Sequence, residues 1–193
     1  MRTPIYWHRL IYRNTYGRSH PAFEERFQAV ADLIKPGSSV LDLGCGDARL
    51  YTHYLKDKDC SYQGIDLSLS MVPHHVLPYT IKGNAIMMEL PPVDYVVMME
   101  ALYHFNSEAG VILGLMRAAA REKVIILEQI KNKITFLPSW LTRFLSNPGN
   151  GSGSSRFDKK ELQDIIREVD PNFEEQEMFD GYDLLITISG GSG

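Results

Sequence analysis

The chain has 193 residues, a formal net charge of −4 and 44% hydrophobic residues, a balance typical of one ordinary globular domain. The acidic balance disfavours nucleic acid as a partner, and no run of about 18 apolar residues is present to form a transmembrane segment. The two cysteines, Cys45 and Cys60, show neither a disulfide pattern nor metal-ligand spacing, so no metal site is expected. We therefore expect a single cytoplasmic domain over residues 1–193.

The first segment, residues 1–20, is an aromatic-rich arm whose interspersed arginines are unlike a secretory signal peptide. Two roles stay open for this arm: a lid over cofactor and substrate, or a cover for one edge of a sheet. Its aromatic candidates are Tyr6, Trp7, Tyr12 and Tyr16. Residues 21–35 then carry apolar side chains at helical spacing behind Pro21, which predicts an amphipathic helix.

Short apolar runs then alternate with segments expected to form crossover helices, the pattern of a parallel sheet covered on both faces. The predicted strands are SVLDLGC (39–45), SYQGIDL (61–67), YTIKGNA (79–85), DYVVMMEAL (94–102) and KVIILEQI (123–130). After a predicted helix over 158–169, the runs 173–180 and 182–189 are expected to pair as an antiparallel hairpin through Gly181. The sequence thus predicts an α/β fold: a doubly wound, mostly parallel, seven-stranded sheet with an antiparallel C-terminal hairpin strand and helices on both faces.

Residues 131–157, after the fifth predicted strand, are interpreted as an insertion. Within them, residues 135–146 predict an amphipathic helix that carries Trp140. Three interpretations stay open for this helix: the wall of an acceptor pocket, core packing, or weak contact with a membrane surface. Residues 149–155 and 190–193 have the glycine and serine content of flexible linkers and are assigned no function.

The stretch VLDLGCGDARL, residues 40–50, predicts a buried strand, a tight glycine turn and then a helix. Nucleotide-type cofactors bind at this place on an α/β sheet. A dinucleotide fingerprint would have its third glycine at Arg49, so NAD or a flavin is the weaker interpretation. Asp42, just before the turn, suits a ligand that carries both an ammonium and a carboxylate. Asp66, at the end of the next predicted strand, is expected to accept hydrogen bonds from ribose hydroxyls.

Together with KGNA (82–85) and DYVVMMEALYHF (94–105), these elements resemble the class I S-adenosylmethionine-dependent methyltransferases over roughly residues 37–130. The resemblance implies a Rossmann-like fold, S-adenosylmethionine as cofactor and S-adenosylhomocysteine as its product. It also implies a set of cofactor-binding residues. These are Asp42, Gly44, Cys45 and Gly46 for the methionine end, Asp66 for the ribose, Leu67, Asn84 and Ala85 for the adenine, and the backbone near Glu100 for the ammonium.

Two positions depart from the pattern of that family. Ala48 stands where a third glycine is usual, and its methyl group is a small intrusion on the turn. Asn84 stands where an acid usually contacts the adenine. Its carbonyl oxygen can accept a hydrogen bond from the adenine amino group, but its own amide then needs another partner.

His104 is the candidate catalytic residue, because the segment after the fourth predicted strand lines the ligand crevice of such a sheet. A histidine there can take a proton from a nucleophilic oxygen or nitrogen, although a capping or packing role stays open. Tyr103 beside it is a candidate for the substrate pocket or lid.

The sequence therefore predicts an enzyme that transfers the methyl group of S-adenosylmethionine to an oxygen or nitrogen of a small, partly apolar acceptor. The alternative is a non-catalytic methyltransferase-like module that binds S-adenosylmethionine, S-adenosylhomocysteine or a protein partner. Neither interpretation assigns an oligomeric state.

Overall fold

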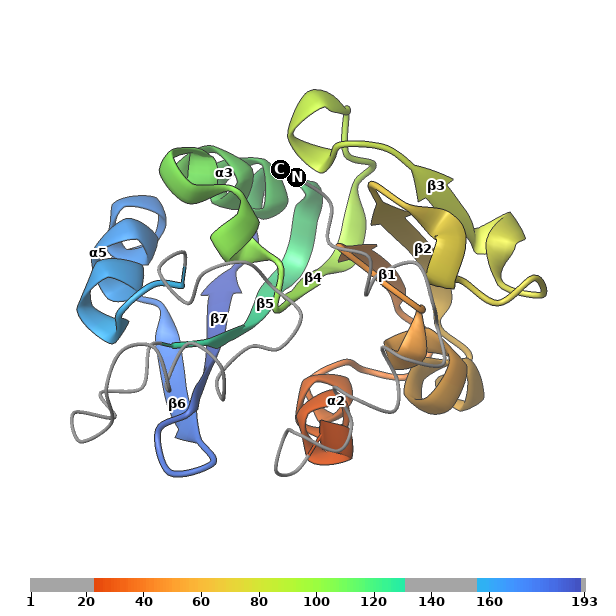
Figure 1. The fold of residues 1–193 in the computed structure, drawn as a ribbon, viewed down its shortest axis with the longest axis horizontal. Coiled ribbons are helices and arrows are strands. Elements are labelled where there is room, and N and C mark those ends of the chain that lie inside the picture. The colour runs from red at the N-terminus through yellow and green to blue at the C-terminus, as the bar shows by residue number, and fades with distance from the viewer. Residues whose placement is uncertain (1–22, 131–155, 192–193) are drawn as a thin grey trace, which may run out of the picture.

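The computed structural model describes residues 23–130 and 156–191. Its centre is a seven-stranded sheet in the order β3-β2-β1-β4-β5-β7-β6 (Figure 1). Each strand coincides with a segment predicted from the sequence, which confirms the predicted sheet. The strands are β1 (Ser39–Leu43), β2 (Ser61–Asp66), β3 (Thr80–Lys82), β4 (Val93–Met99), β5 (Ala120–Gln129), β6 (Glu174–Met178) and β7 (Asp183–Ser189).

Strands β1 to β5 pair in parallel, whereas β7 runs antiparallel to both of its neighbours, β5 and β6. The chain turns from β6 into β7 through three left-handed residues, Phe179, Asp180 and Gly181, with φ of +53°, +56° and +78°. The amide of Tyr182 donates to the carbonyl oxygen of Met178 at 3.1 Å and closes the turn. The predicted antiparallel hairpin is therefore confirmed.

Helices cover both faces of this sheet (Figure 1). Helix α2 (Phe23–Asp32) packs on one face, and α3 (Ala109–Ala119) and α5 (Lys159–Val169) pack on the other. Helix α5 begins with a capping box: the Asp158 carboxylate accepts from the amide of Glu161 at 2.8 Å, and the Glu161 side chain accepts from the amide of Asp158. The helices predicted over 21–35 and 158–169 correspond to α2 and α5.

The core has two layers because side chains alternate between the two faces of each central strand. Val96 and Ile126 point toward α3 and α5, and their neighbours Val97 and Ile125 point toward α2. All four are completely buried. Burial on both faces explains why the central strands are continuous apolar runs rather than alternating ones.

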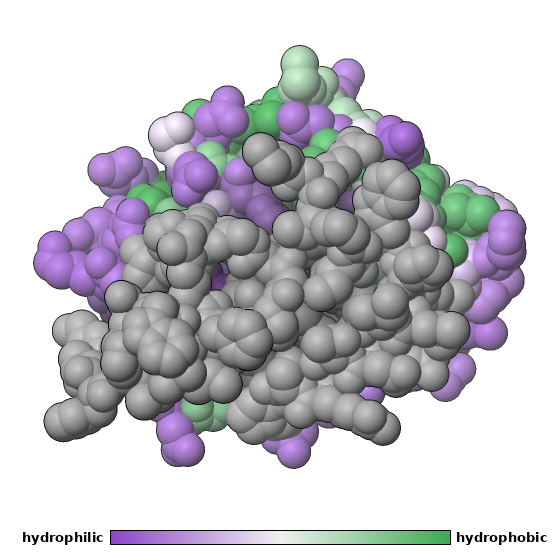
Figure 2. Space-filling model, viewed as in Figure 1, coloured by the Kyte–Doolittle hydropathy of each residue, from purple (hydrophilic) through white to green (hydrophobic). Residues whose placement is uncertain are grey.

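The crossovers from β2 to β3 and from β3 to β4 differ from the prediction, because 3₁₀ turns replace the expected helices. The turns are Leu69–Met71, Leu77–Tyr79 and Ala85–Met87. Prolines at 73, 78, 91 and 92 interrupt these segments, and a proline inside a helix removes a backbone donor and clashes with the preceding turn. In Figure 2 hydrophobic residues reach the surface at this β3 edge, where Ile81 is 37% exposed.

Several predicted segments lie outside the described residues. They are the arm 1–20 with Tyr6, Trp7, Tyr12 and Tyr16, the helix 135–146 with Trp140, and the stretch 149–155. Of the predicted insertion 131–157, Arg156 and Phe157 are described, and both are buried. Within residues 23–130 and 156–191, no helix combines the length and apolar character needed to span a membrane, and no group of three or more His, Cys, Asp or Glu could hold a metal.

The linker-like C-terminal glycines are partly integrated into the fold. The amide of Gly190 donates to the carbonyl oxygen of Glu122, and that of Gly191 donates to Arg117, both at 2.9 Å. A Cβ on Gly190 would lie 2.5 Å from the backbone oxygen of Ala120. Backbone atoms cannot move aside cheaply, so this position has no room for a side chain.

We predict that Gly190→Ala lowers the free energy of unfolding by about 1–3 kcal/mol, because the added methyl group overlaps the backbone of β5. Gly114→Ala is the matched control: Gly114 is exposed in α3 with open space around it, and alanine there stabilises a helix by about 1 kcal/mol. Urea denaturation of both variants measures the difference. Equal midpoints would show that Gly190 is not packed as described.

Candidate functional site

The turn after β1 is built from left-handed residues wedged between the ends of β2 and β4. Gly44, Gly46 and Ala48 have φ of +75°, +56° and +56°. A Cβ on Gly44 would lie 2.6 Å from the Cβ of Ala101, so this close approach requires glycine. The Gly44 amide donates to the carbonyl oxygen of Ile65 at 2.8 Å, which ties the turn to β2. Ala48 is completely buried in a conformation that glycine adopts more easily.

Asp66 lies beside this turn, at the end of β2. One carboxylate oxygen accepts from the amide of Gly46 at 3.0 Å, and the other accepts from the amide of Ser68 at 2.9 Å. Each carboxylate oxygen can accept more than one hydrogen bond, so both retain acceptor capacity. Leu67, the next residue, is 61% exposed. The Asp66 carboxylate, a hydrogen-bond acceptor, and the exposed apolar side chain of Leu67 therefore lie next to one another beyond the turn.

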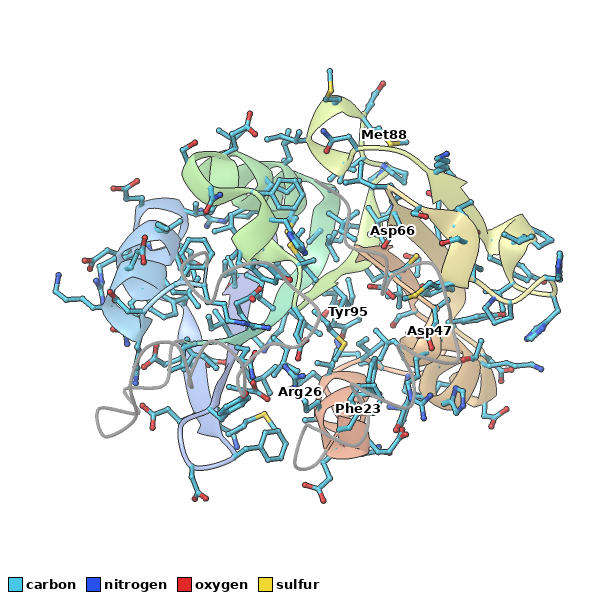
Figure 3. The ribbon with its side chains drawn as sticks, viewed as in Figure 1. Phe23, Arg26, Asp47, Asp66, Met88 and Tyr95 are labelled. Atoms are coloured by element: carbon cyan, nitrogen blue, oxygen red, sulfur yellow. The ribbon has the colours of Figure 1, made fainter. Side chains whose placement is uncertain are left out.

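A pocket opens between the glycine turn, the end of β4 and helix α2. Five of its lining residues belong to the predicted cofactor set: Asp42, Gly44, Cys45, Gly46 and Glu100. The other six were not predicted: Phe23, Arg26, Phe27, Asp47, Leu50 and Met99. Figure 3 shows Phe23 and Arg26 on the side of α2 that is turned toward the sheet, with Asp47 and Asp66 beside the ends of β1 and β2.

Asp42 is the most enclosed acid of the pocket, with 4% of its surface exposed. The Tyr62 hydroxyl donates to its Oδ2 at 2.8 Å. Burial raises the pKa of Asp42 to about 7; the Tyr62 hydrogen bond opposes this shift, and the charges of Asp66 and Asp47 add to it. The Asp42 carboxyl group therefore titrates near neutral pH.

Arg26 is the one cation among the residues that line this pocket, and it is 2% exposed. Its Nε lies 2.7 Å from Oδ2 of Asp183, and its Nη2 donates to Oδ1 of the same carboxylate at 3.2 Å. The remaining guanidinium nitrogen, Nη1, pairs with the Glu100 carboxylate. One guanidinium thus joins α2 to the start of β7 and to the end of β4.

Glu100 holds this position through an unusual backbone conformation. Its φ is +49°, and its amide donates to the carbonyl oxygen of Leu127 at 2.7 Å. The chain therefore turns sharply at the end of β4, while the Glu100 side chain reaches Arg26. Non-glycine residues in this conformation cluster at functional sites.

Sequence reasoning missed Arg26, although a signal for it existed. Arg26 stands three residues after Phe23 and four before Val30, on the apolar stripe of the predicted helix. A basic residue on a stripe that faces the core requires a buried partner. Asp183, its partner, is completely buried and had no comparable signal, because it begins an otherwise ordinary strand.

Two of the three predicted adenine residues, Asn84 and Ala85, lie after β3 and, like Leu67, outside the lining of the pocket. Ala85 is 6% exposed. The backbone carbonyl oxygen of Asn84 accepts a hydrogen bond from the backbone amide of Met87 at 2.9 Å. The amide of Gly83 donates to the carbonyl oxygen of Asp66 at 2.9 Å, so this loop is fixed to the end of β2. Their role toward an adenine stays a prediction.

Tyr103 and His104 follow β4 in a 3₁₀ turn. Tyr103 is buried beneath the Arg156 guanidinium, which lies 5.0 Å from its ring, whereas the side chain of His104 is exposed. The two rings have centroids 3.9 Å apart. Partial desolvation of the imidazole and then the charge of Arg156 lower the pKa of His104. The imidazole is therefore neutral at pH 7 and able to accept a proton.

Glu128 is a second buried acid that sequence reasoning did not single out, although it interrupts an apolar run. It is completely buried at the end of β5, and its Oε2 accepts from the amide of Leu102 at 3.0 Å. Burial raises its pKa to about 7, against the opposing charge of Arg156 and the hydrogen bond from Leu102. Glu128 supports the turn that carries Tyr103 and His104.

Comparison with known proteins places this chain in a family. The family described as "Methionine biosynthesis protein MetW" matches residues 24–129, more than half of the 193 residues. The chain belongs to the MetW family. A search among curated proteins found no match.

Solved structures share the fold at low sequence identity. A chain of the complex between the Haloferax volcanii Trm112 methyltransferase activator and a methyltransferase has a TM-score of 0.66 and 14% identity, covering 99% of this chain and 100% of that chain. An S-adenosylmethionine-dependent methyltransferase from Aquifex aeolicus has a TM-score of 0.61 and 17% identity, covering 89% and 94%. Magnesium protoporphyrin IX methyltransferase from Synechocystis, with bound S-adenosylhomocysteine, has a TM-score of 0.64 and 18% identity, covering 91% and 84%. The MetW-family chain therefore has the class I methyltransferase fold, as the sequence resemblance predicted.

We predict that Asp183→Asn lowers the free energy of unfolding of this MetW-family protein by about 3 kcal/mol or more, because Arg26 then stays buried with one carboxylate fewer. Asp164→Asn, in the exposed pair with Lys160 on α5, is the control and is expected to change stability little. Urea denaturation of the two variants compares them. A small loss for Asp183→Asn would mean that Arg26 is not held by this carboxylate.

Proposed function

We propose that this MetW-family protein binds S-adenosylmethionine in the pocket beside the glycine turn and transfers its methyl group to an oxygen or nitrogen of a small, partly apolar acceptor. The observation that carries the proposal is the union of three features at one sheet edge. They are the tight turn at Gly44 and Gly46, the Asp66 carboxylate against that turn, and the acid-lined pocket that ends at Glu100. Magnesium protoporphyrin IX methyltransferase, which shares the fold and has S-adenosylhomocysteine bound, supports this choice of cofactor.

The charges of the pocket favour a ligand with cationic groups. Three carboxylates, Asp42, Asp47 and Glu100, line it with one guanidinium, Arg26, which also contacts Asp183. S-adenosylmethionine carries an ammonium and a sulfonium near its carboxylate, which suits this arrangement. The pyrophosphate of a dinucleotide would instead face three acids. Charge complementarity therefore favours S-adenosylmethionine over NAD.

The residues around the turn fit the parts of this ligand. Asp42 would face the ammonium, while the amides of residues 44–46 would face the methionine end. Asp66 has acceptor capacity for both ribose hydroxyls, and the exposed Leu67 offers an apolar surface to the adenine. Asn84 and Ala85 would address the adenine edge from the loop after β3.

When bound, the cofactor supplies a methyl group made electrophilic by its sulfonium. The protein would contribute alignment and exclusion of water, which suffice for in-line displacement at carbon. His104 stands exposed after β4 with a lowered pKa, so at neutral pH it can accept the proton of an acceptor hydroxyl or amine. The acceptor would enter from the side of Tyr103 and His104.

A second function, binding without turnover, is favoured by the extent of the family match. Residues 24–129 include the glycine turn and the strand ends beside it, but not residues 135–146, for which the wall of an acceptor pocket is one of the open interpretations. One relative of this fold occurs in a complex with a methyltransferase activator. A binding module would hold S-adenosylmethionine or its product and signal its presence to a protein partner. The family description, methionine biosynthesis, suits such a sensor of methionine-derived ligands as well as an enzyme.

We predict that calorimetric titration detects binding of S-adenosylmethionine and S-adenosylhomocysteine but not of NAD. Asp66→Ala should weaken both affinities about tenfold or more, because it removes a charged acceptor of the ribose hydroxyls. Glu122→Gln, an exposed acid at the opposite end of the sheet, is the control and should leave binding unchanged. Binding of NAD alone, or unchanged affinity in Asp66→Ala, would contradict the proposed cofactor site.

A turnover assay distinguishes the two proposed functions, an enzyme and a binding module. With a panel of small hydroxyl and amine acceptors, an enzyme forms S-adenosylhomocysteine, and His104→Ala should lower kcat tenfold or more at pH 7 if His104 is the base. A binding module gives saturable affinity and forms no product with any acceptor. Turnover that is unchanged in His104→Ala would leave alignment as the source of rate and remove His104 from the proposal.

A further inference from the structure

Tyr62 reaches beneath the glycine turn from strand β2. Its side chain is 8% exposed, and its ring stacks on Tyr51 with centroids 4.5 Å apart and planes inclined by 16°. Its hydroxyl donates to Oδ2 of Asp42 at 2.8 Å. Gly64 leaves room for this contact, because a Cβ there would lie 2.9 Å from the Tyr62 hydroxyl and 2.7 Å from the sulfur of Cys45.

The hydroxyl belongs to a small buried network. Burial raises the pKa of the Cys45 thiol far above its usual range, so the thiol stays protonated beside Tyr62. The pKa of Tyr62 is also raised well above its usual value by burial and by the neighbouring Asp42. The phenol therefore keeps its proton at neutral pH and acts as the hydrogen-bond donor toward the Asp42 carboxylate.

Other charged groups act on Asp42 in the opposite sense. Asp66 at the end of β2 and Asp47 in the turn both disfavour a second negative charge at Asp42. Glu100 at the end of β4 and Arg26 on α2, which pair with one another, complete the charged lining of the pocket; Arg26 also pairs with Asp183. Among the groups that act on Asp42, the Tyr62 hydroxyl favours the carboxylate form.

We propose that Tyr62 is a positioning residue: its hydroxyl holds the Asp42 carboxylate in the ionised form and orientation that receive the ammonium of the bound ligand. The inference rests on the proposed function, because it concerns the same pocket. Tyr62 occupies one oxygen of Asp42 and leaves the other for the ligand. A protonated Asp42 would present a hydroxyl donor to the ammonium, so affinity must rise with pH as Asp42 ionises.

The test measures the dissociation constant of S-adenosylmethionine from pH 5.5 to 9 by calorimetry. In the wild type, affinity rises through a midpoint near the pKa of Asp42, about 7. Tyr62→Phe removes a hydrogen bond to the charged form, so the midpoint moves up by about one to two pH units. At pH 7 affinity then falls about tenfold. The two curves are compared below about pH 8, because the α-amino group of the ligand loses its own proton above that pH.

Two controls isolate the hydroxyl from the ring. Tyr51→Phe removes the hydroxyl of the neighbouring stacked tyrosine and should leave the midpoint unchanged. In an Asp42→Asn background, Tyr62→Phe should have no further effect on the pH profile. A second probe, 5′-deoxy-5′-methylthioadenosine, lacks the ammonium, so its affinity should be the same in the wild type and in Tyr62→Phe.

The wild-type protein offers a readout that needs no substitution. Titration of S-adenosylmethionine in buffers of different ionisation enthalpy measures the protons released on binding, and about half a proton is expected at pH 7. Methylthioadenosine should release none. Absence of proton release with S-adenosylmethionine overturns the proposal even if Tyr62→Phe does not fold.

Failure of this inference is distinct from failure of the proposed function. If the wild type binds S-adenosylmethionine but the Tyr62→Phe curve superimposes on it, Tyr62 does not position Asp42. An equal shift in Tyr51→Phe would assign the effect to the aromatic stack and would also overturn the inference. If the wild type binds no S-adenosylmethionine at any pH, the proposed function itself fails.

Discussion

The close approach of the glycine turn to the neighbouring strand ends is the constraint on which the site depends. The Gly44 amide is bound to β2 through Ile65, while its Cα lies against Ala101 beyond β4. With both sides fixed, the turn can bring Asp42, Asp66 and Glu100 to one edge although they lie at or directly after the ends of three different strands. Parallel strands that end at the same edge make such convergence possible, and the tight turn determines how closely the three acids approach one another.

Buried charge is organised differently on the two faces of the sheet. Toward α2, Arg26 is compensated by two carboxylates and holds the wall of the pocket in place. Toward α3 and α5, Glu128 is held by the amide of Leu102 under the turn that carries His104, with Arg156 nearby. Each buried ionisable group thus supports a segment at the sheet edge. Such polar groups are costly to bury, which is a reason to find them where position matters.

The sheet, the flanking helices α2 and α5 and the glycine turn could be predicted because each has a local signature. Apolar runs mark the strands, a capping box marks α5, and the spacing of Asp42 and Gly44 marks the turn. The crossovers were less predictable, because prolines forced short turns where parallel strands usually have helices. The Arg26–Asp183 pair joins residues 157 positions apart, and no local pattern reports a contact of that range.

Tyr62 shows a second limit of local reasoning. In the sequence Tyr62 has the position of an ordinary core aromatic residue. The contact of its hydroxyl with Asp42 is evident only in the structure, where β2 pairs with β1 and Gly64 leaves space below the turn. Ala48 and Asn84 were visible as departures from a family pattern. Ala48 has a left-handed backbone, which explains why a glycine is usual at that position. In the loop after β3, the backbone oxygen of Asn84 accepts a hydrogen bond from Met87.

The antiparallel strand β7 has a consequence for the order in which the molecule assembles. Among the strands that the structure describes, β6 pairs with β7 alone, and β7 also supplies a carboxylate, Asp183, that pairs with Arg26. Until β7 inserts beside β5, β6 has no partner strand in the described sheet, and a guanidinium on α2 lacks its main counter-charge. Contacts of such long sequence separation form late and slowly, since the chain must close a large loop first. The wall of the pocket at Arg26 therefore depends on the most C-terminal strand of the described sheet, because a chain shortened before β7 lacks the Asp183 carboxylate that pairs with this guanidinium.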